Sequence, residues 1–228
     1  MSLHLEARPG EIASTVLIAG DPHRASHYAE KFLQENFCYN TIRGMLGYTG
    51  MYKGKRVSIQ ATGIGMPSTA LYMHELIHSY GVQRIIRVGT CGAIQSNILL
   101  GQTIVATDSL SDSNIGMHFS GISVPDQVLL QSAMDFAVKS NINLLKGSIF
   151  STDIFYSSDA HRWDEPISQG VLAVEMETSL VYAIAAKFKI QALSLLSVSD
   201  HILTGEITPP KDREAMMDEM MKVAFGIA

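Results

Sequence analysis

Two carboxylates, Glu175 and Glu177, lie where a short apolar run meets a helix. The run Val171–Val174 is typical of a buried strand, and Leu180–Ala186 is typical of the buried side of a helix. A buried carboxylate without a partner is costly, so it is normally hydrogen-bonded, paired with a cation or turned toward a ligand. We therefore expect one of the two to accept hydrogen bonds from adjacent hydroxyls of a ligand, as on a ribose. The alternative is that either carboxylate begins the helix and stabilises its dipole.

A second pattern joins a predicted strand to the start of a helix. The segment 20–24 reads Gly-Asp-Pro-His-Arg, in which Asp21 can cap the helix and Pro22 suits its first position. Free backbone N–H groups, the helix dipole and Arg24 would together bind an anion. The competing interpretation is an ordinary capped turn with a surface arginine. The charge of Asp21 would oppose an anion unless this carboxylate faces away.

Arg87 interrupts the apolar strand predicted over Arg84–Val88, where an apolar side chain would be cheaper to bury. It lies near the carboxyl end of that strand, beside a Gly-Thr-Cys-Gly segment (89–92) that we expect to form a loop open to a ligand. A guanidinium there suits phosphate, and Arg24 and Arg43 are further candidates. The alternative is a buried structural ion pair, and we favour phosphate.

Asp200 follows another strand of small and apolar residues, Ala192–Val198, within Ser199-Asp200-His201. Partial burial disfavours the charged carboxylate, which would let Asp200 give a proton near neutrality. The alternative is a turn or helix cap, the commoner role of an aspartate in such a position.

Two other motifs carry less weight. Gly63-Ile64-Gly65 lacks the third glycine of a dinucleotide fingerprint. His74-Glu75-Leu76-Ile77-His78 matches a zinc-binding helix motif, but no third ligand follows it and it lies in the middle of a predicted helix. We therefore predict no metal site. Cys91 has no evident paired base and is expected to pack as a small apolar residue.

Composition narrows the class of protein. The 228 residues are 46% hydrophobic, which is enough for one large core, and only 17% are charged, where about a quarter is usual. A surface with so few charged residues predicts contacts between subunits. The net charge of −5 without a basic block excludes nucleic acid as a partner. No apolar run is long enough to span a membrane, no signal pattern begins the chain, and two cysteines suit a reducing cytoplasm.

Strand and helix patterns alternate along the chain, which predicts an α/β fold with a mostly parallel sheet between helices. Predicted strands cover residues 15–18, 38–42, 48–52, 56–61, 84–88, 102–108, 144–150, 171–174 and 192–198. Predicted helices cover residues 23–32, 67–80, 127–140 and 180–186, with a final helix from about residue 211 and a mobile loop over 204–210. No linker divides the chain, so we expect a single domain, residues 1–228.

Taken together, these segments resemble the nucleoside phosphorylase family, specifically its hexameric bacterial purine enzymes. The resemblance covers nearly the whole chain and rests on segments in the family's order: Gly20-Asp21-Pro22-x-Arg24-Ala25, Arg43-Gly44-Met45-Leu46-Gly47, Ile85-Ile86-Arg87-Val88-Gly89-Thr90-Cys91-Gly92-Ala93, Phe155-Tyr156-Ser157, Val174-Glu175-Met176-Glu177 and Val198-Ser199-Asp200-His201. It implies a mixed central β-sheet sandwiched by helices.

The resemblance also implies roles. Phosphate is held by Gly20, Arg24, Arg87 and Thr90, with Arg43 from a neighbouring subunit. Ribose is held by Met176 and Glu177, with His4 from the neighbour. The base is held by Phe155, Val174, Glu175 and Ser199. Asp200 protonates purine N7 with help from Arg213, while inorganic phosphate serves as co-substrate and neither metal nor organic cofactor is needed. The implied assembly is a hexamer, a trimer of dimers.

The sequence departs from the family pattern at several positions. Thr90 stands where serine is usual, which keeps the hydroxyl, and Ala19 replaces a proline. The segment Ser111–Asp126 is shorter than in the family and lacks its Asn-Arg and His-Asp-Phe pieces, so substrate preference and subunit contacts there are open.

The alternatives to the purine enzyme are a uridine phosphorylase-like or broad-specificity nucleoside phosphorylase and a non-catalytic nucleoside-binding protein. A uridine phosphorylase would carry a long insertion before the central strand, which this chain lacks. A nucleosidase that uses water would lack the phosphate arginines. A non-catalytic nucleoside-binding protein would not need Asp200 or Arg213. Preference among inosine, guanosine and adenosine also stays open.

Overall fold

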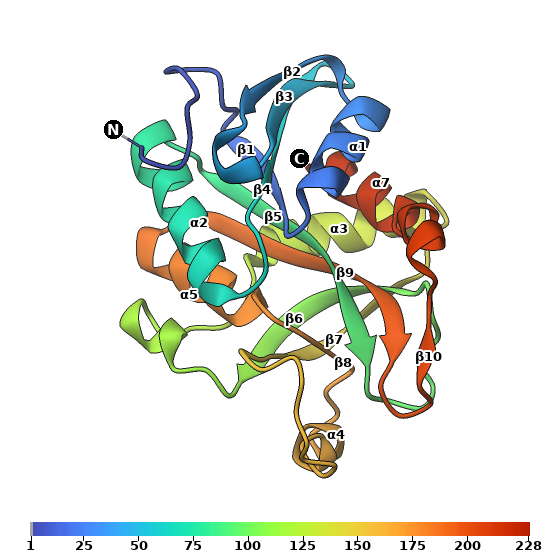
Figure 1. The fold of residues 1–228 in the computed structure, drawn as a ribbon. Helices are drawn as coiled ribbons and strands as arrows, with labels where there is room; N and C mark the ends of the chain where they lie inside the picture. Colours follow the sequence, from blue (N-terminus) through green and yellow to red (C-terminus); the bar gives the residue numbers. More distant parts are fainter. Residues whose placement is uncertain (1) are drawn as a thin grey trace.

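The computed structural model describes residues 2–228 and is built around one mixed β-sheet with helices on both faces (Figure 1). Its ten strands are ordered β10-β9-β6-β7-β8-β5-β1-β4-β3-β2, and β5 also pairs with β9. The strands are β1 (Thr15–Ala19), β2 (Gln34–Asn40), β3 (Gly47–Tyr52), β4 (Lys55–Ala61), β5 (Arg84–Ala93), β6 (Thr103–Ser111), β7 (Leu144–Ser151), β8 (Ala173–Glu175), β9 (Gln191–His201) and β10 (Glu206–Ile207). The predicted α/β fold with a mixed central sheet is confirmed.

The sheet has an open half and a closed half. In the open half β4, β1 and β5 run parallel, and β3 and β2 follow as antiparallel strands. In the closed half, β5, β9, β6, β7 and β8 form a ring, because β8 pairs with both β7 and β5. The long strand β5 belongs to both halves, so it carries side chains from the open sheet into the mouth of the ring.

Helices cover the two faces of the sheet and enclose two apolar cores. One core packs residues of α1, α3 and α7 against the sheet, and the other packs residues of α2 and α5 against the opposite face. All five residues of β1 are buried, as expected for a parallel strand covered on both faces. The helices are α1 (Pro22–Phe32), α2 (Met66–Tyr80), α3 (Gln127–Lys139), α4 (Asp164–Ser168), α5 (Thr178–Phe188), α6 (Arg213–Met216) and α7 (Asp218–Ile227).

Three predictions about local structure were wrong. Residues 89–92 do not form a loop: they continue β5 to Ala93, because β9 continues beside them to His201 and both strands keep their hydrogen bonds. The extended segment predicted over 38–42 begins earlier, at Gln34, where it pairs with β3. The loop predicted over 204–210 contains a short strand, β10, that pairs with the end of β9.

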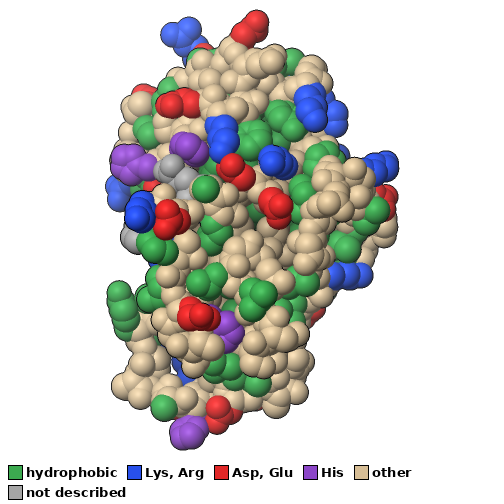
Figure 2. Space-filling view, turned by 90° about the vertical axis from the view of Figure 1, so that its right-hand side faces the viewer, with side chains coloured by type: hydrophobic (Ala, Val, Ile, Leu, Met, Phe, Trp, Pro, Cys, Tyr) green, Lys and Arg blue, Asp and Glu red, His purple; other side chains and the backbone are tan. Residues whose placement is uncertain are grey.

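The distribution of charged side chains on the surface is consistent with the low fraction of charged residues in the sequence. On the face shown in Figure 2, the described lysine and arginine side chains are interspersed with acidic and apolar ones and form no continuous basic patch. Among residues 2–228, no helix combines the length and the apolar character that a membrane crossing requires.

Candidate active site

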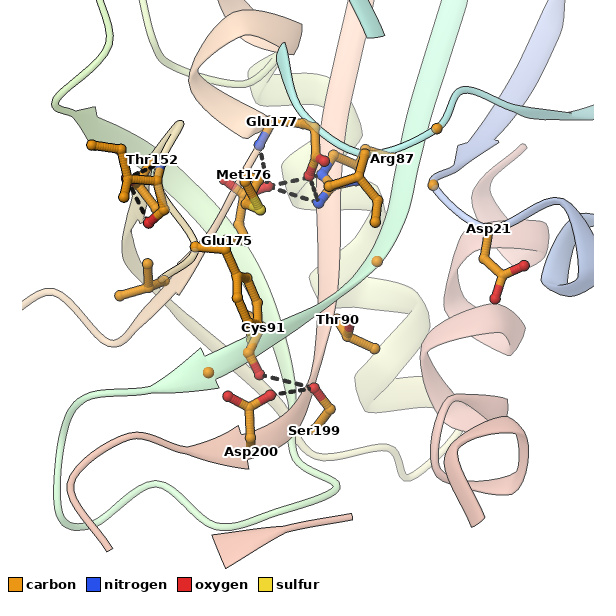
Figure 3. A pocket seen from close by; sticks show the side chains of 18 of the residues that line it. Asp21, Arg87, Thr90, Cys91, Thr152, Glu175, Met176, Glu177, Ser199 and Asp200 are labelled. Atoms are coloured by element: carbon orange, nitrogen blue, oxygen red, sulfur yellow. Dashed lines mark hydrogen bonds and ion pairs between the residues drawn. The ribbon is translucent and has the colours of Figure 1, made fainter. Parts of the chain in front are cut away.

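A cavity of about 880 Å³ opens where β1, β4, β5 and β9 reach their carboxyl ends (Figure 3). Parallel strands bring their carboxyl ends to one edge, which is where open α/β sheets bind ligands. Most of the predicted site residues line this cavity: Gly20, Arg24, Arg87, Thr90, Phe155, Val174, Glu175, Met176, Glu177, Ser199, Asp200 and Arg213. Residues far apart in the sequence therefore meet in one place.

One side of the cavity is formed by the turn between β1 and α1. The Asp21 carboxylate caps α1 by accepting a hydrogen bond from the His23 backbone N–H at 2.8 Å. Its second oxygen lies 3.6 Å from Nε of Arg24. Gly20 packs against the next turn, because a Cβ there would lie 3.2 Å from the Gly63 carbonyl oxygen. The charge of Asp21 is thus engaged by the helix and by Arg24, and the start of α1 stays open to the cavity.

Arg87 forms a buried ion-pair cluster with both carboxylates. Its Nη2 lies 2.8 Å from an oxygen of Glu175 and 2.5 Å from an oxygen of Glu177, and its side chain is 5% exposed. Gly89 leaves room for this arrangement, because a Cβ there would lie 2.9 Å from Nη2. The structural ion pair, which the sequence analysis placed second, is therefore present. Arg87 also lines the cavity, so its guanidinium borders the space in which a ligand would lie.

The two carboxylates have different surroundings. Glu175 accepts hydrogen bonds from the backbone N–H groups of Glu177 and Thr178 at 2.9 and 3.0 Å, and also from the Ser151 hydroxyl. It therefore satisfies the start of α5, as the helix-dipole alternative predicted. Among the described residues, the oxygens of Glu177 accept hydrogen bonds from the Gly65 N–H at 2.6 Å and from Arg87. Each oxygen of Glu177 can still accept from a ligand.

Burial sets the electrostatics of this cluster. Desolvation raises the pKa of Glu177, and the charge of Arg87 opposes part of that rise. Desolvation alone would lower the pKa of Arg87, but the two carboxylates outweigh it and raise that pKa. Burial also raises the pKa of the Cys91 thiol, which agrees with the prediction that Cys91 packs as an apolar residue.

Asp200 is turned into the cavity by an irregularity in the pairing of β9 with β5. Cys91 pairs with Val198 and Gly92 pairs with Asp200, so Ser199 is an extra residue on β9. Such a bulge re-aims the neighbouring side chains. Asp200 crosses over the backbone of Gly92, where a Cβ would lie 2.6 Å from its carboxylate, and it accepts a hydrogen bond from the Ser199 hydroxyl at 2.7 Å.

Arg213 lines the same cavity as Asp200. Its Nε donates to the Thr208 carbonyl at 3.1 Å, and the Thr208 N–H donates to the Ser199 carbonyl at 2.8 Å. No ion pair joins Arg213 to Asp200 within the part of the chain that the structure describes. Thr208 therefore connects Arg213 to the strand that carries Asp200.

The other side of the cavity is apolar and aromatic. Phe155 lines it from the segment after β7, with its residue 70% exposed, and Val174 and Met176 line it from β8 and the residues that follow. The sequence analysis missed Trp163 and Ile202, which also line the cavity. The aromatic content of the segment after β7 was the one available signal for Trp163, and nothing in the local pattern distinguished Ile202.

His4 and Arg43 do not line the cavity. Nδ1 of His4 lies 2.8 Å from a carboxylate oxygen of Glu75, and the ring centroid of His4 lies 6.2 Å from that of Tyr72. Burial raises the pKa of Tyr72, and the nearby charge of Arg43 partly opposes that rise. His4 therefore lies beside Tyr72 on the flank of α2, and the charge of Arg43 acts on the same phenol.

The His-Glu-x-x-His segment of α2 has a structural explanation. Glu75 accepts hydrogen bonds from the N–H groups of Leu3 and His4 and from the Ser2 hydroxyl, so it holds the N-terminal segment. The rings of His74 and His78 lie 4.2 Å apart between centroids, beside Phe188. Among residues 2–228, no group of three or more His, Cys, Asp or Glu side chains is arranged to hold a metal ion.

Comparison with known proteins identifies the family. The family model described as "Phosphorylase superfamily" matches residues 14–228, so the chain belongs to this superfamily. Its relatives include a "Purine nucleoside phosphorylase DeoD-type" from Geobacillus sp. (strain WCH70), 48% identical over 100% of this chain and 98% of the relative. Proteins of the same name from Bacillus cytotoxicus and Bacillus cereus (strain ZK / E33L) are 46% identical over 100% of this chain and 99% of each relative.

Proposed function

We propose that this protein catalyses the reversible phosphorolysis of purine ribo- and deoxyribonucleosides, giving the free base and the pentose 1-phosphate. One observation carries the proposal: Arg24 at the start of α1 and the carboxylates of Glu177 and Asp200 all line one cavity. The full-length similarity to purine nucleoside phosphorylases supports it.

Phosphate would be bound where β1 meets α1. Gly20, Arg24 and Thr90 border that side of the cavity, and Arg87 adds a cation that the two glutamates hold in position. Backbone N–H groups at a helix start and guanidinium groups both favour a phosphate dianion. Arg43 would complete the site from a neighbouring subunit.

The ribose would lie next to Glu177. This carboxylate has an unused accepting position at each oxygen, which suits the two adjacent hydroxyls of the sugar. Met176 would pack against the sugar, and His4 of a neighbouring subunit would reach its 5′-hydroxyl. Phosphate held on the α face would then attack C1′ as the glycosidic bond stretches and the sugar gains oxocarbenium character.

The purine would lie between Phe155 and Val174, with Glu175 and Ser199 at its edge. Asp200 would protonate N7, so that the base leaves as a neutral molecule, and Arg213 would assist. We propose no metal or organic cofactor, since inorganic phosphate is itself the second substrate.

We further propose that the chain acts as a single domain, residues 1–228, in a cytoplasmic homohexamer that serves purine salvage. Neither His4, which lies beside Tyr72, nor Arg43 lines the cavity of its own subunit, which supports their use in a neighbour's site. The low content of charged residues supports extensive contacts between subunits.

The test is a nucleoside panel assayed with and without phosphate. Inosine should release hypoxanthine only when phosphate is present, and uridine should react far more slowly than inosine. Equal release in phosphate-free buffer would turn the assignment toward a hydrolase, and a preference for uridine would turn it toward the pyrimidine enzymes. Binding without turnover would favour a nucleoside-binding protein.

A further inference from the structure

A polar network outside the predicted site closes the base of the segment that carries Phe155. Asp112, after β6, accepts hydrogen bonds from the Thr152 hydroxyl at 2.8 Å and from Nη2 of Arg162 at 2.7 Å. Nη1 of Arg162 donates to the Ile154 carbonyl at 2.7 Å, and Nη2 also donates to the Thr152 hydroxyl. We call these three side chains, Asp112, Thr152 and Arg162, the Asp–Thr–Arg clamp.

The clamp is joined directly to the centre of the site. The Thr152 N–H donates to the Glu175 carbonyl at 2.9 Å, and the Ser151 hydroxyl donates to the Glu175 carboxylate. Thr152 is buried at 3% exposure, and the Arg162 side chain is 12% exposed. Both ends of segment 152–162 are therefore held at a defined distance from the buried carboxylates.

Between these ends the segment has little packing of its own. Ile154, Phe155 and Tyr156 are 56%, 70% and 89% exposed. Few buried apolar contacts mean that such a segment opens at low cost in free energy. The position of Phe155 over the cavity therefore depends on the clamp rather than on a core.

The clamp also reaches the tryptophan that the sequence analysis missed. The Arg162 guanidinium carbon lies 4.7 Å from the ring centroid of Trp163, and Phe150 meets the same ring edge-on at 5.9 Å. Stacking of an arginine on an indole fixes the orientation of both groups. Trp163 lines the cavity, so Arg162 orders both Phe155 and Trp163 on the apolar side of the cavity.

We infer that Arg162 is a positioning residue for the nucleobase, acting through Phe155 and Trp163 and locked by Asp112. The inference rests on the proposed function for the identity of the base. It gives a role to the segment Ser111–Asp126, which departs from the family pattern, because that segment supplies Asp112. The shortened segment thus contributes to recognition of the substrate.

The first test separates binding from chemistry. Arg162→Met keeps the length of the side chain and removes its charge and donors. The KM for inosine should rise about tenfold, or about 1.4 kcal/mol, while kcat changes less than about threefold and the KM for phosphate stays unchanged. The matched control is Lys187→Met, which removes a cation from an exposed position of α5 and should alter nothing. An unchanged KM for inosine would overturn the inference.

The second test does not need turnover. Trp163 is the only tryptophan, so its emission and its quenching by acrylamide report on this segment alone. Arg162→Met should expose the indole, and titration calorimetry should show hypoxanthine binding about tenfold more weakly than to the wild type. Unchanged quenching and affinity would reject the clamp. Because hypoxanthine binding is measured directly, a failure of phosphorolysis itself would be seen separately.

Two more variants test the geometry. Arg162→Lys keeps the charge but cannot reach Asp112 and the Ile154 carbonyl with two separate nitrogens, so its KM should fall between those of wild type and Arg162→Met. Asp112→Asn should raise the KM for inosine as well, and the double variant with Arg162→Met should be no worse than Arg162→Met alone. Additive losses would show that the two residues act independently.

Discussion

Arg87 illustrates how the surroundings of a residue determine its role. A guanidinium beside a glycine-rich strand suits phosphate, yet its Nη2 lies within 2.8 Å of two carboxylates. Its charge opposes part of the rise that burial causes in the pKa of Glu177. Removal of Arg87 would leave two buried carboxylates without a cation.

We predict that Arg87→Met lowers the free energy of unfolding by about 3–5 kcal/mol, or roughly 6–20 °C in the melting temperature. Without Arg87 the pKa of Glu177 rises further above its value in the unfolded chain. A carboxyl group with a raised pKa in the folded state favours folding at low pH, and that contribution is lost as the pH rises through the folded pKa. The deficit should therefore be larger at about pH 8 than at about pH 5.

Thermal unfolding of wild type and Arg87→Met at both pH values measures this prediction. Arg8→Met is the matched control, because the Arg8 side chain is 87% exposed. A deficit that is the same at both pH values would mean that Glu177 does not depend on Arg87 for its charge.

The role proposed for Asp200 is also that of a single residue, because it consists of one proton transfer. Asp200→Asn should reduce the rate on inosine by roughly a hundredfold to ten-thousandfold. The loss should be smaller for 7-methylguanosine, whose base already carries a positive charge and leaves without protonation at N7. Initial rates on both substrates decide the matter, with Asp135→Asn on the surface of α3 as the control. Equal losses would make Asp200 a binding or structural residue.

At the scale of elements, α2 connects the N-terminal segment to the rest of the fold. Glu75 accepts four hydrogen bonds from Ser2, Leu3 and His4. Burial would raise the pKa of Glu75, but these donors together lower it. A lowered pKa stabilises the folded state above the ordinary value of 4.5, and the contribution is lost as the pH falls through the lower, folded value. The segment should therefore stay attached throughout the neutral range.

Glu75→Gln should release this segment, because it removes the charge and one accepting position. Hydrogen exchange at the amides of Leu3 and His4 should speed up, and the KM for inosine should rise roughly three- to tenfold if His4 contacts the sugar of a neighbour. His74→Ala combined with His78→Ala is the control and should change neither quantity. Loss of activity in that double variant, together with bound zinc, would revive the metal interpretation.

At the scale of the whole molecule, the cavity of one subunit lacks two of the residues proposed to complete it. His4 lies on the flank of α2 and Arg43 lies in the turn between β2 and β3, and neither lines the cavity that the proposed phosphate and ribose groups face. On the proposed roles, a second copy of the chain would have to bring these residues to the site. Catalysis would then require assembly.

This requirement predicts complementation between two inactive variants. Arg43→Ala and Asp200→Asn should each be nearly inactive alone, and subunit exchange should restore about a quarter of the sites, because one site of each mixed pair is intact. Activity measured before and after mixing gives the result, and mixing either variant with itself is the control. A fully active monomer in light scattering would contradict the shared site.

Local patterns were sufficient for most elements of this protein. The buried runs of β1 and β9, the Asp-Pro start of α1 and the hairpin of β3 and β4 all follow from short-range rules of burial, capping and turns. Local patterns gave the wrong structure at residues 89–92, where the glycines suggested a loop. Strand pairing over the whole length of β5 and β9 overrode that local preference.

By itself, the sequence determined the α/β class, the family resemblance and a set of site residues most of which line the cavity, because these depend on residue type and order. Only the tertiary structure decided which role each residue takes. It assigned Glu175 to the start of α5 and left Glu177 open to a ligand, and it paired Arg87 with both. It also brought Asp112 to Arg162. Such pairings depend on distances between strands far apart in the chain, which no local pattern encodes.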